Sequence, residues 1–347
     1  MRILSAATLG LVTLGACVLH EEEVTPPMPG PSFRRIERFD PRMDKLIPKN
    51  AEIEVLGEGF TWTEGVVWLP TERCILFSDI PNNRVMKWKE GQGMSLYLKP
   101  SGYTSDVPRG GETGSNALLL DPQGRLVLCQ HGDRRVARMD APLNAPAPRF
   151  VTLADRYDGK RLNSPNDLVY HSNGSLYFTD PPYGLEKNMA DPAKQLDFQG
   201  VFRLSPNGEL TLLTRELTRP NGIAFSPDEK KLYIAVSDPD RAIYMVYDVQ
   251  PNGSIANGKV FFDSTKWYKE KQLGLPDGIK CDVNGNLWAT GPGGGVYIFA
   301  PDGTLLGAIK TGARTANLNW GDDGSTLYIC AHMGMLRVKT STKGKGF

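Results

Sequence analysis

Six polar side chains stand at matching places along the chain, each at the start of a short apolar run. In chain order they are Glu64, Asn116, Asn166, Asn221, Asp277 and Asn317. They precede a recurring leucine by 12, 10, 10, 11, 10 and 10 residues respectively. Two are carboxylates and four are amides, so all six offer oxygen to a ligand. Oxygen ligands favour a hard cation: Ca²⁺ matches best, Mg²⁺ and Mn²⁺ match less well, and Zn²⁺ is disfavoured because nitrogen and sulfur ligands are lacking.

A purely structural role for these residues is the alternative. Asn and Asp are common turn formers, especially before Gly, and some of the six could serve only as backbone caps. Glu64 is not a turn former, and it stands in the same register as the other five. The regular spacing therefore favours a metal site that uses a subset of them.

The elements that must position these side chains are short strands in a repeated pattern. The recurring leucines are separated by 50, 50, 56, 55 and 40 residues, and they are Leu76, Leu126, Leu176, Leu232, Leu287 and Leu327. Polar turns such as DPQG, HSNG and DVNG come before most of them. Each copy has room for three or four strands, and none contains a long amphipathic helix. The pattern predicts an all-β, six-bladed β-propeller over residues 49–347, with a β-sandwich or a solenoid as the alternative.

The propeller architecture would bring the six polar residues together. In a propeller the first strand of each blade lines the central channel, so equivalent positions at the starts of these strands form a ring around the axis. We therefore expect a central-channel metal site that holds one divalent cation. Ca²⁺ is the expected ion, and Mg²⁺, Mn²⁺ and Zn²⁺ remain alternatives.

Composition and charge exclude other classes of protein. The chain has 347 residues, of which 40% are hydrophobic and 23% are charged, which is typical of a globular protein. Its formal net charge of +1 gives no overall field that would attract nucleic acid or anionic lipid. A charge-driven nucleic-acid or membrane-surface binder is therefore not expected.

The N-terminus has the pattern of an export signal. Met1 and Arg2 precede an apolar run, and the run ends in Leu-Gly-Ala before Cys17. This ending resembles the bacterial lipoprotein box, which implies a signal peptide at 1–16 and a lipidated Cys17. The residue after the cysteine is Val, which by the same resemblance implies a protein anchored in the outer membrane on the periplasmic side. Simple secretion is the alternative. Residues 17–48, acidic and Pro-rich, are expected to form a flexible tether.

The remaining cysteines give no disulfide or metal pattern. Cys74, Cys129, Cys281 and Cys330 are far apart in the sequence and form no C-x-x-C pair. We expect buried free thiols, although export to an oxidising compartment leaves disulfide pairing as an alternative.

Several longer segments resemble the senescence marker protein/regucalcin/gluconolactonase family of six-bladed propellers. They span roughly residues 50–340 and include TEG at 63–65 with Trp68, RLNSPNDLVYHSNGSLYFTDPPYGL, RPNGIAFSPD and PDGIKCDVNGNLW. The resemblance implies a metal held by Glu64, Asn166, Asn221 and Asp277, and it leaves Asn116 and Asn317 to line the channel or contact substrate. It also implies hydrolysis of a sugar lactone to the aldonic acid, with the cation acting as a Lewis acid on the lactone carbonyl.

The general base and the substrate contacts are less clearly defined. The resemblance makes Asp277 the catalytic base, although a carboxylate bound to a cation is a weaker base. His131 follows the second marker strand and could act at the channel mouth as a base or a lactone contact. Arg161 resembles the substrate-binding arginine of the family. Tyr183, in DPPYG, could stack on a sugar, and the Gly-rich loop 102–116 has the composition of a lid.

Three functions compete for this architecture. The first is a sugar lactonase, whose expected partner is a small-molecule lactone. We expect this protein to be a monomer or a weak dimer. A phosphotriesterase, or a paraoxonase-like lactonase for lipophilic lactones, would use the same propeller and similar ligands. A non-catalytic surface propeller that binds protein or glycan is the third candidate, but it would not need Glu64 and Asp277 in the channel.

Overall fold

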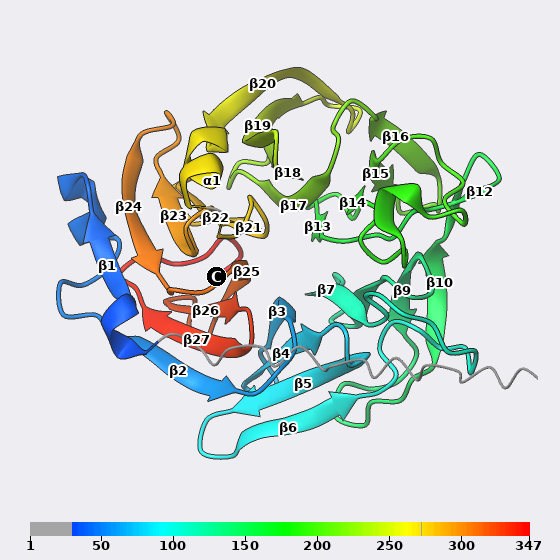
Figure 1. Ribbon diagram of the computed structural model, residues 1–347, viewed down its shortest axis with the longest axis horizontal. Helices are drawn as coiled ribbons and strands as arrows, with labels where there is room; N and C mark the ends of the chain where they lie inside the picture. Colours follow the sequence, from blue (N-terminus) through cyan, green and yellow to red (C-terminus); the bar gives the residue numbers. More distant parts are fainter. Residues whose placement is uncertain (1–29, 272) are drawn as a thin grey trace, which may run out of the picture.

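The structure is a computed structural model, and it describes residues 30–271 and 273–347. Six antiparallel sheets are arranged as blades around a central axis (Figure 1). The expected six-bladed β-propeller is therefore confirmed. Cys17 and the expected signal peptide lie outside the described residues. Within those residues, no helix is long and apolar enough to cross a bilayer.

The first three blades follow one another along the chain, each as a simple meander. Blade 1 consists of β3 (Thr63–Leu69), β4 (Cys74–Asp79), β5 (Arg84–Lys89) and β6 (Gly93–Leu98). Blade 2 consists of β7 (Ser115–Leu120), β8 (Leu126–Gln130), β9 (Arg135–Met139) and β10 (Phe150–Ala154). Blade 3 consists of β13 (Leu168–Tyr170), β14 (Leu176–Asp180), β15 (Gly200–Leu204) and β16 (Leu210–Thr214).

The last three blades complete the ring. Blade 4 consists of β17 (Pro220–Phe225), β18 (Lys231–Asp238), β19 (Arg241–Val249) and β20 (Ile255–Asp263). Blade 5 consists of β21 (Ile279–Cys281), β22 (Leu287–Gly291), β23 (Gly295–Phe299) and β24 (Leu305–Lys310). Blade 6 has β25 (Thr315–Gly321), β26 (Thr326–Ala331) and β27 (Gly334–Lys339) from the C-terminal part of the chain. In all six blades the recurring leucine lies on the second strand, as the repeat predicts.

Two N-terminal strands join the last two blades. Strand β2 (Ile53–Glu58) pairs with β27 and is the outermost strand of blade 6, so both ends of the described chain build one sheet. Strand β1 (Arg35–Arg38) pairs with β24 as a fifth strand of blade 5. The following 3₁₀ turn η2 (Pro41–Lys45) buries Met43 against the core. The propeller therefore includes residues 35–48, which the sequence analysis placed in the tether, because a four-residue strand carries almost no periodic signal.

The connections hold the few other elements. The hairpin of β11 (Arg156–Tyr157) and β12 (Lys160–Arg161) lies between blades 2 and 3. The helix α1 (Thr265–Lys271) lies between blades 4 and 5. Two short 3₁₀ turns, η1 (Pro31–Phe33) and η3 (Asn188–Ala190), complete the set.

The core is divided among the blade interfaces. Apolar side chains form six clusters, and each cluster takes residues from two neighbouring blades. Strand β3 contacts β7 and β25, and the other first strands likewise contact their neighbours, which closes an inner ring. Cys74, Cys129, Cys281 and Cys330 are buried in these interfaces as free thiols, as expected. Burial of apolar surface between blades thus fixes where the first strands stand around the channel.

Candidate active site in the central channel

Regular strand pairing is interrupted at the six polar positions. In β3, β7, β17 and β25 the register shifts at or beside Glu64, Asn116, Asn221 and Asn317. In blades 3 and 5 the first strand begins only two residues after Asn166 and Asp277. A bulge or a late start frees a residue from the ladder and re-aims its side chain. The repeat therefore frees a polar side chain from regular strand pairing at the start of every blade.

Five of the six side chains line one cavity on the axis. The cavity has a volume of about 330 Å³, and its walls include Glu64, Asn116, Asn166, Asn221 and Asp277. The sixth residue, Asn317, lies behind this surface, and its Nδ2 donates to Oε2 of Glu64 at 3.0 Å. The structure thus brings together the side chains that the spacing selected, although their chemical roles stay predictions.

Hydrogen bonds orient several of the oxygens toward the cavity. Oε2 of Glu64 accepts from the Gly65 N–H at 3.0 Å, in addition to the bond from Asn317. Nδ2 of Asn221 donates to Oγ of Ser237 at 2.9 Å, so the amide oxygen is left for a ligand. Within the described residues, the buried Oδ1 atoms of Asn116 and Asp277 have no hydrogen-bond partner. Unpaired buried oxygens are costly, and a bound cation would satisfy them.

The two acids of the ring strongly favour a positive neighbour. The pKa of Glu64 is raised to about 8, chiefly by burial, with the charges of Asp167 and Glu112 as smaller causes in the same direction. Burial also raises the pKa of Asp277 well above its ordinary value, with the charge of Glu64 as the next cause. Like charges in a site of low dielectric repel, and a divalent cation between them would reverse both effects.

Glycines allow the inner strands to approach one another. A Cβ on Gly65 would lie 2.1 Å from the carbonyl oxygen of Asn116 in the next blade. A Cβ on Gly222 would lie 2.2 Å from the carbonyl oxygen of Asp277. Each of these glycines directly follows a ring residue, so the E-G and N-G pairs of the sequence meet a packing requirement as well as a turn preference.

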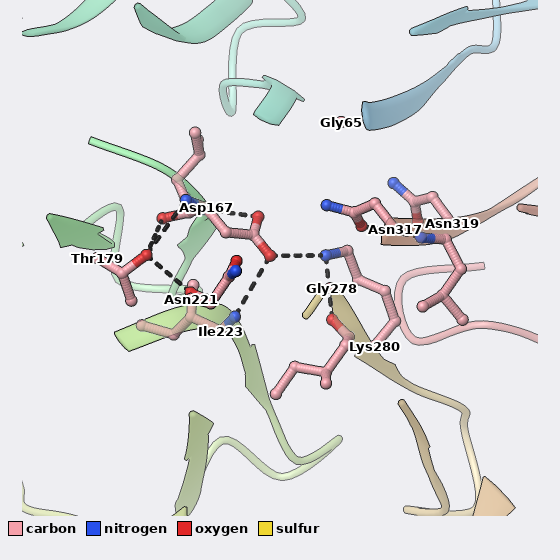
Figure 2. Close-up of polar contacts among 12 residues, drawn as sticks. Gly65, Asp167, Thr179, Asn221, Ile223, Gly278, Lys280, Asn317 and Asn319 are labelled. Carbon is pink, nitrogen blue, oxygen red and sulfur yellow. Dashed lines mark hydrogen bonds and ion pairs between the residues drawn. The ribbon is translucent and has the colours of Figure 1, made fainter. Parts of the chain in front are cut away.

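An ion pair between a buried carboxylate and a half-buried lysine links three blades beside the ring. Figure 2 shows Asp167 between Lys280 and the backbone of Ile223. Oδ2 of Asp167 is 3.5 Å from Nζ of Lys280 and accepts from the Ile223 N–H at 3.3 Å. These residues lie within three positions of Asn166, Asp277 and Asn221, respectively. The pair therefore ties together the strands that carry three of the ring residues.

Of three further residues that were predicted to contact substrate or to act in catalysis, one lines the cavity and two do not. Tyr183 lines the cavity, and its hydroxyl makes no hydrogen bond within the described residues. His131 does not line the cavity: its side chain is fully buried, with Nδ1 2.9 Å from Oε2 of Glu112. Arg161 does not line it either, because its Nη2 donates to the carbonyl oxygen of Asp133 at 2.6 Å. The expectation that His131 stands at the channel mouth is therefore corrected, and the substrate-binding role expected for Arg161 stays a prediction.

Other cavity residues were not identified from the sequence. The remaining walls include Trp62, Glu112, Ser237, Tyr268, Leu275 and Arg314. Ser237 lies near the end of β18, and the others come from loops between strands or between blades and from α1, which do not share the repeat. Only Glu112 had an indirect signal, because it lies in the Gly-rich loop expected to form a lid.

The donor set fits a hard cation. In the part of the chain that the structure describes, no group of three or more His, Cys, Asp and Glu side chains is placed to hold a metal. The ring instead combines two carboxylates with three amides, all of them oxygen donors on the cavity wall. This chemistry suits Ca²⁺ or Mg²⁺ better than Zn²⁺.

Comparisons with known proteins agree with this architecture. The profile of the SMP-30/gluconolactonase/LRE-like region matches residues 62–333. A gluconolactonase from Zymomonas mobilis is 41% identical over 323 residues, which are 91% of this chain and 89% of that protein. Bovine regucalcin is 29% identical over 81% of this chain and 87% of its own length. A solved gluconolactonase from Xanthomonas campestris is 29% identical with a TM-score of 0.75, covering 91% of this chain and 97% of that chain. Together with the six-bladed ring and its axial cavity, these matches show that the chain belongs to the SMP-30/gluconolactonase/LRE-like family.

Proposed function

We propose that this protein is a lactonase, a carboxylic-ester hydrolase that opens a sugar lactone to its aldonic acid with the help of one divalent cation. The observation that carries the proposal is the convergence of Glu64, Asn166, Asn221 and Asp277 on one axial cavity. The relatives named gluconolactonase support the reaction class. The family resemblance and the unpaired ring oxygens support the cation, with Ca²⁺ as the first candidate.

Each part of the cavity has a task in this reaction. The two carboxylates would hold the cation and balance its charge, and the amide oxygens of Asn166 and Asn221 would complete the ligand set. When bound, the cation supplies positive charge that polarises the lactone carbonyl and stabilises the developing oxyanion. Asn116 and Tyr183 line the same cavity and can bond to the hydroxyl groups of a sugar.

The test is a substrate and metal panel on purified protein. Chelated protein is reconstituted with Ca²⁺, Mg²⁺, Mn²⁺ or Zn²⁺ and assayed on aldonolactones, an alkyl lactone and an aryl phosphotriester. We expect cation-dependent hydrolysis of aldonolactones above the spontaneous rate. Preference for the alkyl lactone or the phosphotriester would favour the rival enzymes, and inactivity on all three would favour a binding protein.

Variants of the ring test the assignment of ligands. Asn221→Ala and Asp277→Ala should lower kcat/KM by about 100-fold or more, because each removes an oxygen from the cation. Asn144→Ala is the matched control, since this asparagine is exposed and lies outside the cavity. Full turnover by metal-stripped protein, or by Asp277→Ala, would contradict the proposed mechanism.

A further inference from the structure

A third acidic side chain faces the cavity without belonging to the ring. Glu112 lies in the connection between β6 and β7, and its side chain is 37% exposed. It lines the same cavity as the ring residues. The six-fold repeat does not include this position, so its presence at the site needs a separate explanation.

The loop that carries Glu112 is fastened to the propeller. The Gly114 N–H donates to the carbonyl oxygen of Ile80 at 2.8 Å. Nη1 of Arg109 donates to the carbonyl oxygen of Gly132 at 3.1 Å, and Nη2 donates to that of Gly184. These bonds fasten the loop that carries Glu112 to blades 1, 2 and 3.

The side chain of His131 lies against the Glu112 carboxylate. Its Nδ1 lies 2.9 Å from Oε2 of Glu112, although the two groups are not aligned for a hydrogen bond. Neither ring nitrogen of His131 has a hydrogen-bond partner within the described residues. The fully buried ring of His131 is a fixed neighbour that limits the positions open to the Glu112 carboxylate, and the contact is made by Oε2.

Glu112 is also close to the ring in electrostatic terms. Its negative charge is among the causes that raise the pKa of Glu64, of Asp277 and of Tyr183. This effect agrees with the position of the Glu112 carboxylate on the cavity wall.

We propose that Glu112 is the general base of the lactonase reaction and that His131 is the residue that positions it. The inference rests on the proposed function and names a base that the repeat could not supply. Asp277 is poorly suited to this task because a carboxylate that ligates a cation loses basicity. Glu112 faces the same cavity from a loop outside the ring.

The proton and bond changes balance with lactone and water alone. Oε1 of Glu112 takes a proton from a water molecule as the water oxygen forms a bond to the lactone carbonyl carbon. The tetrahedral intermediate then breaks its ring C–O bond and reforms the carbonyl. The departing ring oxygen takes a proton from the Glu112 carboxylic acid, which returns to the carboxylate. The product is the open-chain hydroxy acid.

The test compares Glu112→Gln with the parent protein and with Asp106→Asn. Asp106 is an exposed acid on the same loop and outside the cavity, so its variant should keep the parent kcat. Glu112→Gln keeps the shape of the side chain and should lower kcat by about 100-fold or more, which is the usual contribution of a general base. Its calorimetric affinity for Ca²⁺ should stay within about three-fold of the parent, since it is not a ligand.

Two further variants separate proton transfer from a structural effect. In Glu112→Ala, added formate should restore part of kcat, because a small carboxylate can occupy the vacated place. His131→Phe keeps a ring in the buried position and should lower kcat less than Glu112→Gln does. The double variant should be no slower than Glu112→Gln alone, since a positioning residue acts only through the base.

The outcomes distinguish this inference from the proposed function. A parent protein that hydrolyses no lactone would overturn both. An active parent, together with a Glu112→Gln variant that keeps its kcat or a Glu112→Ala variant that formate does not rescue, would overturn only the role of Glu112. Equal losses of kcat and Ca²⁺ affinity in Glu112→Gln would likewise overturn it, because Glu112 would then be a metal ligand.

Discussion

The residue types of the ring set the charge of the site. Two carboxylates carry the negative charge, and amide oxygens fill the other positions without adding to it. Burial already raises the pKa of both acids, so further carboxylates at these positions would be hard to keep ionised. A ring dominated by asparagine therefore gives a divalent cation enough oxygen ligands with a matching charge.

Gly65 is the residue with the least room for change. It has a φ of +57°, and a Cβ would lie 2.1 Å from the backbone oxygen of Asn116. We expect Gly65→Ala to lower the free energy of unfolding by about 3 kcal/mol or more, because backbone atoms of two blades would have to separate. Urea unfolding measures this change, with Gly124→Ala as the control. Gly124 has a φ of +75° but nothing within 4 Å, so a loss of only about 1 kcal/mol is expected there. Equal losses in the two variants would contradict the steric argument.

Burial of Lys310 makes the free energy of unfolding depend on pH in the alkaline range. This residue is buried on β24 with Nζ donating to the Tyr297 hydroxyl at 2.8 Å, and burial lowers its pKa from 10.5 to about 8. Between these two values the unfolded chain binds more protons than the folded one, so this group makes the free energy of unfolding rise with pH. Below pH 8 the full cost of the buried charge is present.

The Lys310→Met variant tests this sign. Relative to the parent, the variant should gain more stability at pH 7 than at pH 9.5, with a difference of roughly 2 kcal/mol from the size of the shift. Urea unfolding at the two pH values measures it. The same stability difference at both pH values would show that Lys310 does not titrate in this range.

At the scale of elements, the repeat could be recognised in the sequence because every blade has the same structural requirement at its first two strands. The turn before Leu126 or Leu176, and the polar residue ten positions earlier, reflect a strand that must leave the ladder at the channel and then pair again. Each of the six sequence repeats carries a polar residue and the same leucine at nearly constant spacing. The sequence therefore predicted the six blades, the second strands and the ring.

The elements that escaped prediction lie outside the repeat. Strand β1 has four residues and half-buried side chains, so it has no periodicity to detect. Glu112, Tyr268 and Arg314 reach the cavity from connections whose paths depend on the assembled blades. His131 and Arg161 follow strands or motifs that were recognised, but their side chains turn to Glu112 and to the Asp133 carbonyl instead of the cavity. Distances between loops of different blades cannot be read from spacing along one chain.

For the whole molecule, closure of the ring depends on strands from opposite ends of the sequence. Strand β2 supplies the outer strand of blade 6, whose inner strand β25 contacts β3 of blade 1. Blade 6 therefore depends on N-terminal residues for its outer edge, and an open edge at β27 would expose unpaired backbone groups. The axial cavity depends on this closure as well, because its walls come from all around the ring.

Truncation from the N-terminus separates the two added strands. A chain that starts at residue 41 loses β1 but keeps η2 and β2. We expect it to fold with a lower Tm and with lactonase activity similar to that of a chain starting at residue 30.

A chain that starts at residue 60 also loses β2 and the buried Met43, Leu46 and Ile47, so blade 6 loses its edge strand and part of its core. Since each buried side chain contributes about 2 kcal/mol or more, this chain should show no cooperative unfolding transition and should aggregate. Circular dichroism melts and size-exclusion chromatography measure both results. A cooperative melt and full activity in the chain starting at residue 60 would mean that the ring closes without its N-terminal strand.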